Sequence, residues 1–80
     1  MPPSMTTRRS QVHLDLARAA ARQGDDRLAV LHLLEGERVA AQAISRNASA
    51  RSLVSELLAR ERKGATPGLR ALANRADVLR

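Results

Sequence analysis

Every apolar side chain of this 80-residue chain is aliphatic or a thioether, because the sequence has no Phe, Trp, Tyr or Cys. Ala accounts for 15 of the hydrophobic residues, and only 20 are larger than Ala. A domain of this length buries roughly 60% of the surface of its unfolded chain, and small domains commonly add disulfides, a metal or a partner chain. Disulfides and cysteine metal sites are excluded here. The composition therefore predicts one small domain with a thin core that a neighbouring repeat or subunit completes.

The larger apolar residues recur at the spacing of helices, and no segment alternates as a strand does. Residues 1–10 hold two of the three prolines and show no periodicity. We therefore expect an all-α fold of about four helices, with a disordered basic arm over 1–10 and one helical domain over 11–80. The expected helices begin near Gln11, Asp26, Ser49 and Pro67.

Capping residues divide these helices. Gly24 suits the left-handed position after a helix, and Asp25 can cap the helix that follows, which predicts a helical hairpin joined by a tight turn. The second helix should run to about Ala41. Ser45 or Asn47 can cap the third, which should run to Lys63. In that third helix, Glu56 and Arg60 have the spacing of an i, i+4 ion pair. For the fourth helix, Thr66 is the expected cap and Pro67 the first residue.

The second helix is apolar on most of its circumference. His32 is the one polar residue between Leu28 and Leu34. A helix with such a wide apolar arc needs neighbours on more than one side. We expect Leu28, Leu31 and Leu34 to pack against another repeat or another chain, including a second copy of this one. In the first helix, the stripe formed by His13, Leu16, Ala17 and Ala20 is expected to face inward.

The hairpin around Gly24 and Asp25 resembles a tetratricopeptide repeat, the 34-residue pair of helices that stacks into solenoids. The small and large residues of that motif match Leu16-Ala17 in the first helix and Ala29, Leu33 and Gly36 in the second. Three positions differ from the motif, because His13, Ala20 and Ala41 stand where it prefers Trp, Tyr and Pro.

A longer pattern over about residues 11–79, carried by segments 13–18, 33–38 and 60–70, is similar to the C-terminal part of bacterial helix-turn-helix regulators of the xenobiotic-response-element type. In that family a DNA-binding domain precedes a tetratricopeptide-like sensory domain. The resemblance implies stacked helical hairpins and a role in transcriptional control through an effector, a peptide or self-association. The DNA-binding domain would then be supplied elsewhere. The same resemblance implies a concave groove for a protein or peptide, lined on the first helix by Gln11, Leu14, Arg18, Ala21 and Arg22.

Enzymatic chemistry is not expected, nor is a cofactor or metal. His13 and His32 lack a third ligand, and the aspartates beside Gly24 are explained by capping. Glu35 and Glu37 stand two residues apart on a helix and so diverge.

The basic residues support an alternative, a small nucleic-acid-binding protein, because the formal net charge is +6. Arg8 and Arg9 are expected in the arm, and Arg60, Arg62, Lys63 and Arg70 near the third turn. Direct DNA binding is the less favoured interpretation. Segment 69–78 resembles the first helix of a helix-turn-helix, but the chain has no residues for a recognition helix after it.

No segment has the length of a membrane span, since the longest apolar run covers only residues 28–31. The polar N-terminus lacks the apolar region of a secretory signal. We therefore expect a cytoplasmic protein that does not enter membranes. Arg makes up 13 of the 14 basic residues, which favours a bacterial source with GC-rich coding sequence.

Overall fold

The computed structural model describes residues 5–62 and 66–76, with the side chains of residues 5–7, 42 and 43 left aside. Within these ranges the chain forms five helices and no strand, which confirms the all-α prediction. The helices are α1 (Met5–Arg22), α2 (Asp26–Val39), α3 (Ala41–Arg46), α4 (Ala48–Ala59) and α5 (Leu69–Arg75).

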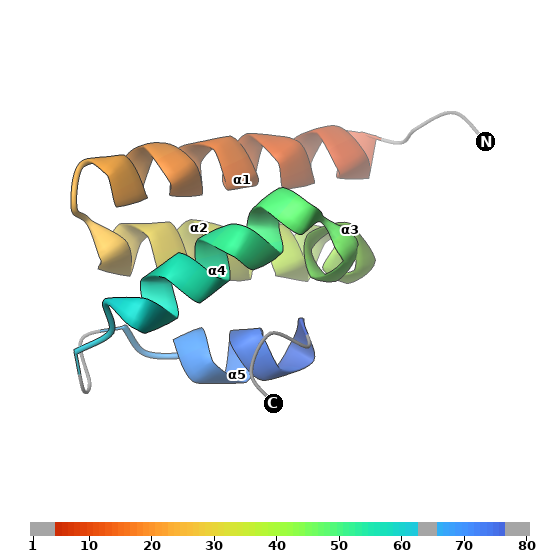
Figure 1. Ribbon diagram of the computed structural model, residues 1–80. Coiled ribbons are helices and arrows are strands. Elements are labelled where there is room, and N and C mark those ends of the chain that lie inside the picture. Colours follow the sequence, from red (N-terminus) through yellow and green to blue (C-terminus); the bar gives the residue numbers. More distant parts are fainter. Residues whose placement is uncertain (1–4, 63–65, 77–80) are drawn as a thin grey trace.

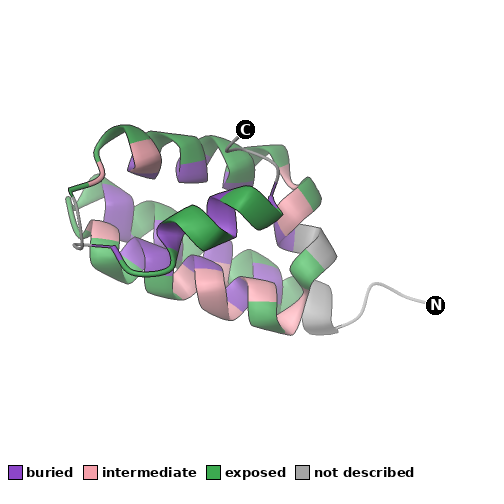
Figure 2. Cartoon of the chain, turned by 90° about the horizontal axis from the view of Figure 1, so that it is seen from below, coloured by how far each residue is buried: buried purple, intermediate pink, exposed green. Residues whose placement is uncertain are grey.

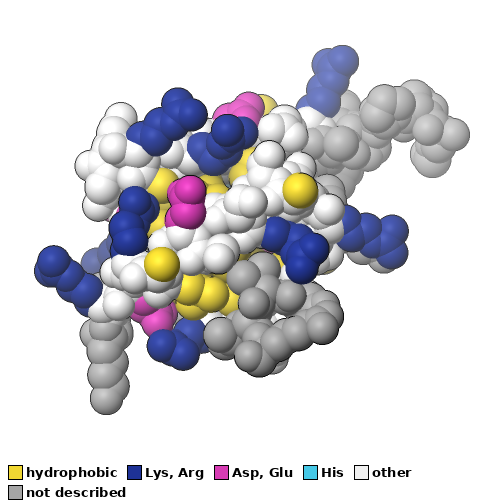
Figure 3. Space-filling view, in the orientation of Figure 1, with side chains coloured by type: hydrophobic (Ala, Val, Ile, Leu, Met, Phe, Trp, Pro, Cys, Tyr) yellow, Lys and Arg dark blue, Asp and Glu magenta, His cyan; other side chains and the backbone are white. Residues whose placement is uncertain are grey.

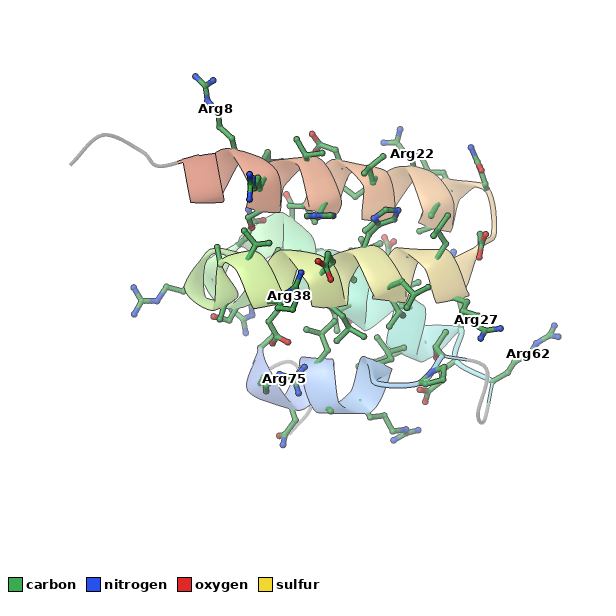
Figure 4. All side chains as sticks on the ribbon, turned by 180° about the vertical axis from the view of Figure 1, so that it is seen from behind. Arg8, Arg22, Arg27, Arg38, Arg62 and Arg75 are labelled. Atoms are coloured by element: carbon green, nitrogen blue, oxygen red, sulfur yellow. The ribbon has the colours of Figure 1, made fainter. Side chains whose placement is uncertain are left out.

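The other four helices lie around α2. Figure 1 shows α1 antiparallel to α2 on one side and α5 along the opposite side of α2, with α4 crossing over them from one face. The short helix α3 lies at the end of the hairpin where α2 finishes. The other face of the α1–α2 hairpin carries no helix of the described part of the chain (Figure 4).

The turn of the hairpin forms as the sequence predicts. Gly24 adopts φ +81°, a conformation that a residue with a Cβ rarely takes. The backbone N–H of Leu28 donates to the Asp25 carboxylate at 3.1 Å, which caps α2. A glycine end and an aspartate start therefore reverse the chain within three residues.

The prediction of a disordered arm over 1–10 is wrong for residues 5–10, because α1 begins at Met5. Ser10 is only 3% exposed and extends the inward stripe of Leu14, Ala17 and Ala21 by one helical turn. Because the side chain at this interior position is small and polar, the apolar pattern alone predicts a helix that begins too late. Residues 1–4 lie outside the described residues.

The other helix boundaries differ in detail. α2 ends at Val39 instead of Ala41, and the unpredicted helix α3 follows it. Of the two predicted caps, Asn47 caps α4 and accepts from the Ala50 N–H at 3.0 Å, but this helix ends at Ala59. Lys63, its predicted end, is outside the described residues.

The last helix begins two residues after the predicted proline. Gly68 adopts φ +85° and is the N-cap of α5. Pro67 therefore lies before the helix and is not its first residue. The buried Thr66 does not cap α5; its hydroxyl donates to Glu61 at 3.5 Å.

The core lies between α2 and the helices around it, as the buried side of each ribbon shows in Figure 2. Alanines occupy much of the α1–α2 interface, and leucines dominate α4 and α5. The largest fully buried side chains are Leu14, Val30, Leu33, Ile44, Val54, Leu57, Leu69 and Leu72.

Two ion pairs tie α2 to the C-terminal half. Arg60, just after α4, contacts Asp26 through Nη2 at 2.7 Å and Nε at 3.2 Å. Arg75 of α5 contacts Glu37 through Nη2 at 2.6 Å and Nε at 2.7 Å. The predicted pairing of Arg60 with Glu56 is therefore wrong, because the fold offers Arg60 a bidentate carboxylate on another helix.

Candidate partner-binding surfaces

A cleft of about 390 Å³ lies between the C-terminal half of α1 and α4. The two helices run in the same general direction and separate toward the end of α1 (Figure 1), which opens the cleft. Its lining consists of three residues of α1, five of α4 and one just beyond α4: Arg18, Ala21, Arg22, Ala48, Ser49, Ser52, Leu53, Glu56 and Arg60. We call this site the α1–α4 cleft.

Two arginines of the cleft have no counter-charge. Arg18 and Arg22 stand one turn apart on α1, and both are exposed. Neither forms an ion pair or hydrogen bond with any described residue. Arg22 extends away from the body of the molecule at the end of α1 (Figure 4). Their guanidinium groups are therefore free to bind a ligand.

The α4 wall of the cleft is polar. Ser49 and Ser52 contribute hydroxyl groups that can donate or accept hydrogen bonds, and Glu56 contributes a carboxylate. Arg60 reaches the same cleft, but Asp26 neutralises it. The cleft therefore carries an excess of positive charge on the α1 wall, partly opposed by Glu56 across from it.

The residues predicted for a groove on the first helix divide into two groups. Arg18, Ala21 and Arg22 line the α1–α4 cleft. Gln11 lies outside it and donates to Asp15 at 3.0 Å. The prediction for Leu14 is corrected, because Leu14 is 2% exposed and packs in the core. Its position on α1 directs it toward the interior, so it has no surface for a partner.

The leucines predicted for the second helix also divide. Leu28 is 40% exposed and Leu31 is 55% exposed. Leu34, in contrast, packs against the core, and the turn before α5 lies on it so closely that a Cβ at Gly68 would be 3.1 Å from Leu34 Cδ1. Leu34 is therefore largely covered by this chain's own C-terminal part, which corrects its assignment to an intermolecular surface.

Two exposed apolar residues of α1 were missed. Val12 is 54% exposed and Leu16 is 44% exposed, so the placement of Leu16 in the inward stripe is wrong. Both lie on α1 opposite the buried Leu14. Their i, i+4 spacing, which lies within the helix expected from Gln11, was the available signal.

The two histidines come together between α1 and α2. Their ring centroids are 5.8 Å apart, and His13 Nδ1 is buried without a hydrogen-bond partner. Over residues 5–62 and 66–76, no three His, Asp or Glu side chains are grouped so that they could hold a metal ion. The pair thus contributes to hairpin packing, with one polar atom left unsatisfied.

Two residues of the predicted basic cluster near the third turn are neutralised. Arg60 pairs with Asp26, and Arg70 pairs with Glu61 at 2.9 Å. Arg62 is exposed, and Lys63 lies outside the described residues. Figure 3 shows basic side chains spread over the face that α4 crosses, with acidic side chains among them. This surface is not a continuous basic patch.

Comparisons with protein-family models, with curated proteins and with solved structures found no match to this chain. In the described part of the chain, no helix combines the length and the apolar character that a membrane span requires. The functional proposals below therefore depend on the surfaces of the molecule and on the resemblance of its sequence segments.

Proposed function

We propose that this chain is a non-enzymatic interaction module that binds an acidic segment of a protein or peptide in the α1–α4 cleft. The single observation that carries this proposal is the pair of uncompensated arginines, Arg18 and Arg22, on one wall of a defined cleft. Guanidinium groups bind carboxylates through paired, charge-assisted hydrogen bonds, which are the stronger hydrogen bonds in proteins.

The spacing of the two arginines specifies a pattern of acidic residues. Residues four apart on a helix are separated by about 6 Å along the axis. In an extended peptide, side chains two residues apart point to the same face and are separated by about 6.6 Å. Arg18 and Arg22 therefore match two acidic residues with one residue between them, a Glu-x-Glu pattern. Ser49 and Ser52 can hydrogen-bond the peptide backbone from the opposite wall.

The resemblance to helix-turn-helix regulators supports placing this binding step in bacterial transcriptional control. The antiparallel hairpin with its Gly-Asp turn is consistent with a tetratricopeptide-like unit. In this proposal the chain acts in the cytoplasm and a separate polypeptide or domain contacts DNA. Binding of the acidic segment would then couple an effector protein or peptide to that DNA-binding partner.

The distribution of charge favours a protein segment over nucleic acid. A phosphate backbone requires several free cations along an extended surface. Around the third turn, however, Arg60 and Arg70 are already paired with carboxylates. A DNA duplex is therefore used as a competing ligand in the test.

Fluorescence anisotropy with a labelled peptide of about ten residues that contains Glu-x-Glu tests the proposal. Charge reversal in R18E/R22E should weaken binding by at least about tenfold, since two charge-assisted contacts are lost. The matched control R46E/R62E reverses the same number of exposed arginines outside the cleft and should bind nearly as the wild type does. E56Q should bind more tightly, because it removes the opposing carboxylate.

A second peptide with the same composition, in which the two glutamates are adjacent, tests the spacing and should bind more weakly. Equal losses of binding in R18E/R22E and R46E/R62E would show that only net charge matters and would contradict the cleft as the site. Binding of a DNA duplex that R18E/R22E leaves intact, with no binding of the peptide, would favour the nucleic-acid alternative.

A further inference from the structure

We infer that a second copy of this chain covers the face of the α1–α2 hairpin opposite the α1–α4 cleft. This surface, called the hairpin face, carries Val12 and Leu16 from α1 and Leu28 and Leu31 from α2. These four are the exposed large hydrophobic residues among those described. The inference is independent of the cleft, because none of the four residues lines it.

The four side chains lie on the same side of the hairpin, away from its buried residues. On α1, Val12 and Leu16 are i, i+4 neighbours. On α2, Leu28 has Leu31 as its i, i+3 neighbour and His32 as its i, i+4 neighbour. The contact between the rings of His13 and His32 shows that α1 and α2 approach closely at this place. No described helix covers this side (Figure 4), whereas α4 covers the other. This side of the hairpin is therefore open, and both of its helices expose large aliphatic residues there.

Charges on the edge of this face are self-complementary. Arg8, Val12 and Asp15 lie on one stripe of α1, at spacings of four and three residues. Asp15 is exposed and forms no ion pair within the described chain, and the exposed Arg8 has no partner there. Arg8 points outward from the first turns of α1 (Figure 4). A two-fold axis can pair Arg8 of one copy with the Asp15 carboxylate of the other.

The acidic residues beside the hairpin face favour a second copy of this chain, and not a lipid or nucleic-acid surface, as its partner. Asp15 borders the apolar patch on α1, and Glu35 lies on α2 between Leu31 and Arg38. The Asp15 carboxylate would face lipid phosphates or a nucleic-acid backbone, which repel it, whereas Glu35 is already paired with Arg38. In a dimer, the Asp15 carboxylate can meet Arg8 of the other copy.

The area of the hairpin face is large enough for a small dimer interface. An 18-residue helix is about 27 Å long, and two adjacent helices are about 20 Å wide, which gives a face on the order of 500 Å². A standard interface buries roughly 800 Å² of accessible surface on each partner, including the sides of its protruding side chains. With four large aliphatic residues at its centre, this face supports association at micromolar to millimolar concentration.

Sedimentation velocity of the wild-type chain over that range of concentration tests the inference. We expect a concentration-dependent shift from the 8.7 kDa monomer to a dimer. L16Q/L31Q should remain monomeric and helical, because both residues are exposed and glutamine is a good helix former. A59Q, at an exposed position of α4, is the matched control and should dimerise as the wild type does.

Raising the salt concentration separates this association from binding at the cleft. Salt at about 0.5 M screens both the repulsion between two chains of charge +6 and the Arg8–Asp15 pairs, so the apolar contacts should maintain the dimer. The same salt should weaken binding of the acidic peptide, which depends on charge. A chain that stays monomeric and folded at every concentration would overturn the inference, as would a dimer that L16Q/L31Q leaves intact. Neither result bears on whether R18E/R22E loses the peptide, so failure here is distinct from failure of the proposed function.

Discussion

The α1–α2 interface and the α4–α5 part of the molecule fill their interiors with different side chains. Between α1 and α2 the buried residues include Ala17, Ala20 and Ala29, and Gly36 lies so close to α1 that a Cβ there would be 3.3 Å from His13 Cβ. In α4 and α5 the buried residues are mostly leucines. The hairpin thus gains stability from close approach of its backbones, and the C-terminal part from the bulk of its side chains.

This difference has a consequence for the surface. The hairpin buries Leu14, Val30 and Leu33 beside its alanines, but it also keeps four large aliphatic residues outside, on the hairpin face. The C-terminal part places its leucines inside and anchors its ends to α2 with the Asp26–Arg60 and Glu37–Arg75 ion pairs. The two regions should therefore respond in opposite ways to a change in side-chain volume.

The largest effect is expected from L57A, which truncates a fully buried leucine of α4. Removing this side chain leaves a cavity and should lower the free energy of unfolding by about 2–5 kcal/mol. Urea denaturation followed by circular dichroism measures the loss. L58A, which truncates the partly buried neighbour, should cost clearly less; equal losses would show that bulk does not stabilise α4 as described.

The opposite change is expected to damage the hairpin. A17L enlarges a residue that is 0% exposed in the α1–α2 interface and should lower the free energy of unfolding by about 1–3 kcal/mol through overpacking. A19L places the same side chain on an exposed position of α1. Thermal melts of the two variants compare them directly, and an A17L protein as stable as A19L would contradict a close-packed hairpin.

A smaller effect is expected where α2 is joined to the C-terminal part. E37Q and D26N each remove one ion pair in which the carboxylate is more buried than the arginine. Each should cost about 1 kcal/mol or less, as partly exposed pairs do. Hydrogen exchange of α5 amides reports whether E37Q loosens α5 selectively. Unchanged α5 exchange in E37Q would show that the Glu37–Arg75 pair contributes nothing to docking.

The smallest effect concerns an exposed pair within α2. The hydrogen bond from Arg38 holds the pKa of Glu35 below its ordinary value. Because the folded-state pKa is lowered, the stabilisation is present above the unfolded pKa of about 4.3 and is lost as the pH falls through the folded value. The stability difference between the wild type and E35Q, measured by urea denaturation, should therefore shrink below about pH 4. A difference that stays constant would contradict this linkage.

Local signals allowed much of the fold to be predicted from the sequence. Gly24, Asp25 and Asn47 act through bonds to residues at most a few positions away, and all three have the expected roles. The start of α1 and the partner of Arg60 depend on residues that are distant in sequence. Ser10 is buried by tertiary packing, and Asp26 reaches Arg60 across 34 positions.

The candidate sites show the same limit. The resemblance to tetratricopeptide repeats assigned Arg18, Ala21 and Arg22 to a groove on the first helix, and the cleft contains all three. The resemblance could not supply the α4 wall, because that wall depends on how α4 crosses α1. The apolar pattern could not exclude Leu34 from the exposed residues, since the covering turn at Gly68 comes 34 positions later.

The central claim is that the α1–α4 cleft and the hairpin face are two independent binding surfaces on opposite sides of one hairpin. Sedimentation velocity with the fluorescent Glu-x-Glu peptide tests it directly, because one experiment reports both the mass of the protein and the bound peptide. We expect R18E/R22E to lose peptide binding and still dimerise. We expect L16Q/L31Q to stay monomeric and still bind the peptide. A variant that loses both properties while remaining helical, or two variants that lose neither, would contradict the claim.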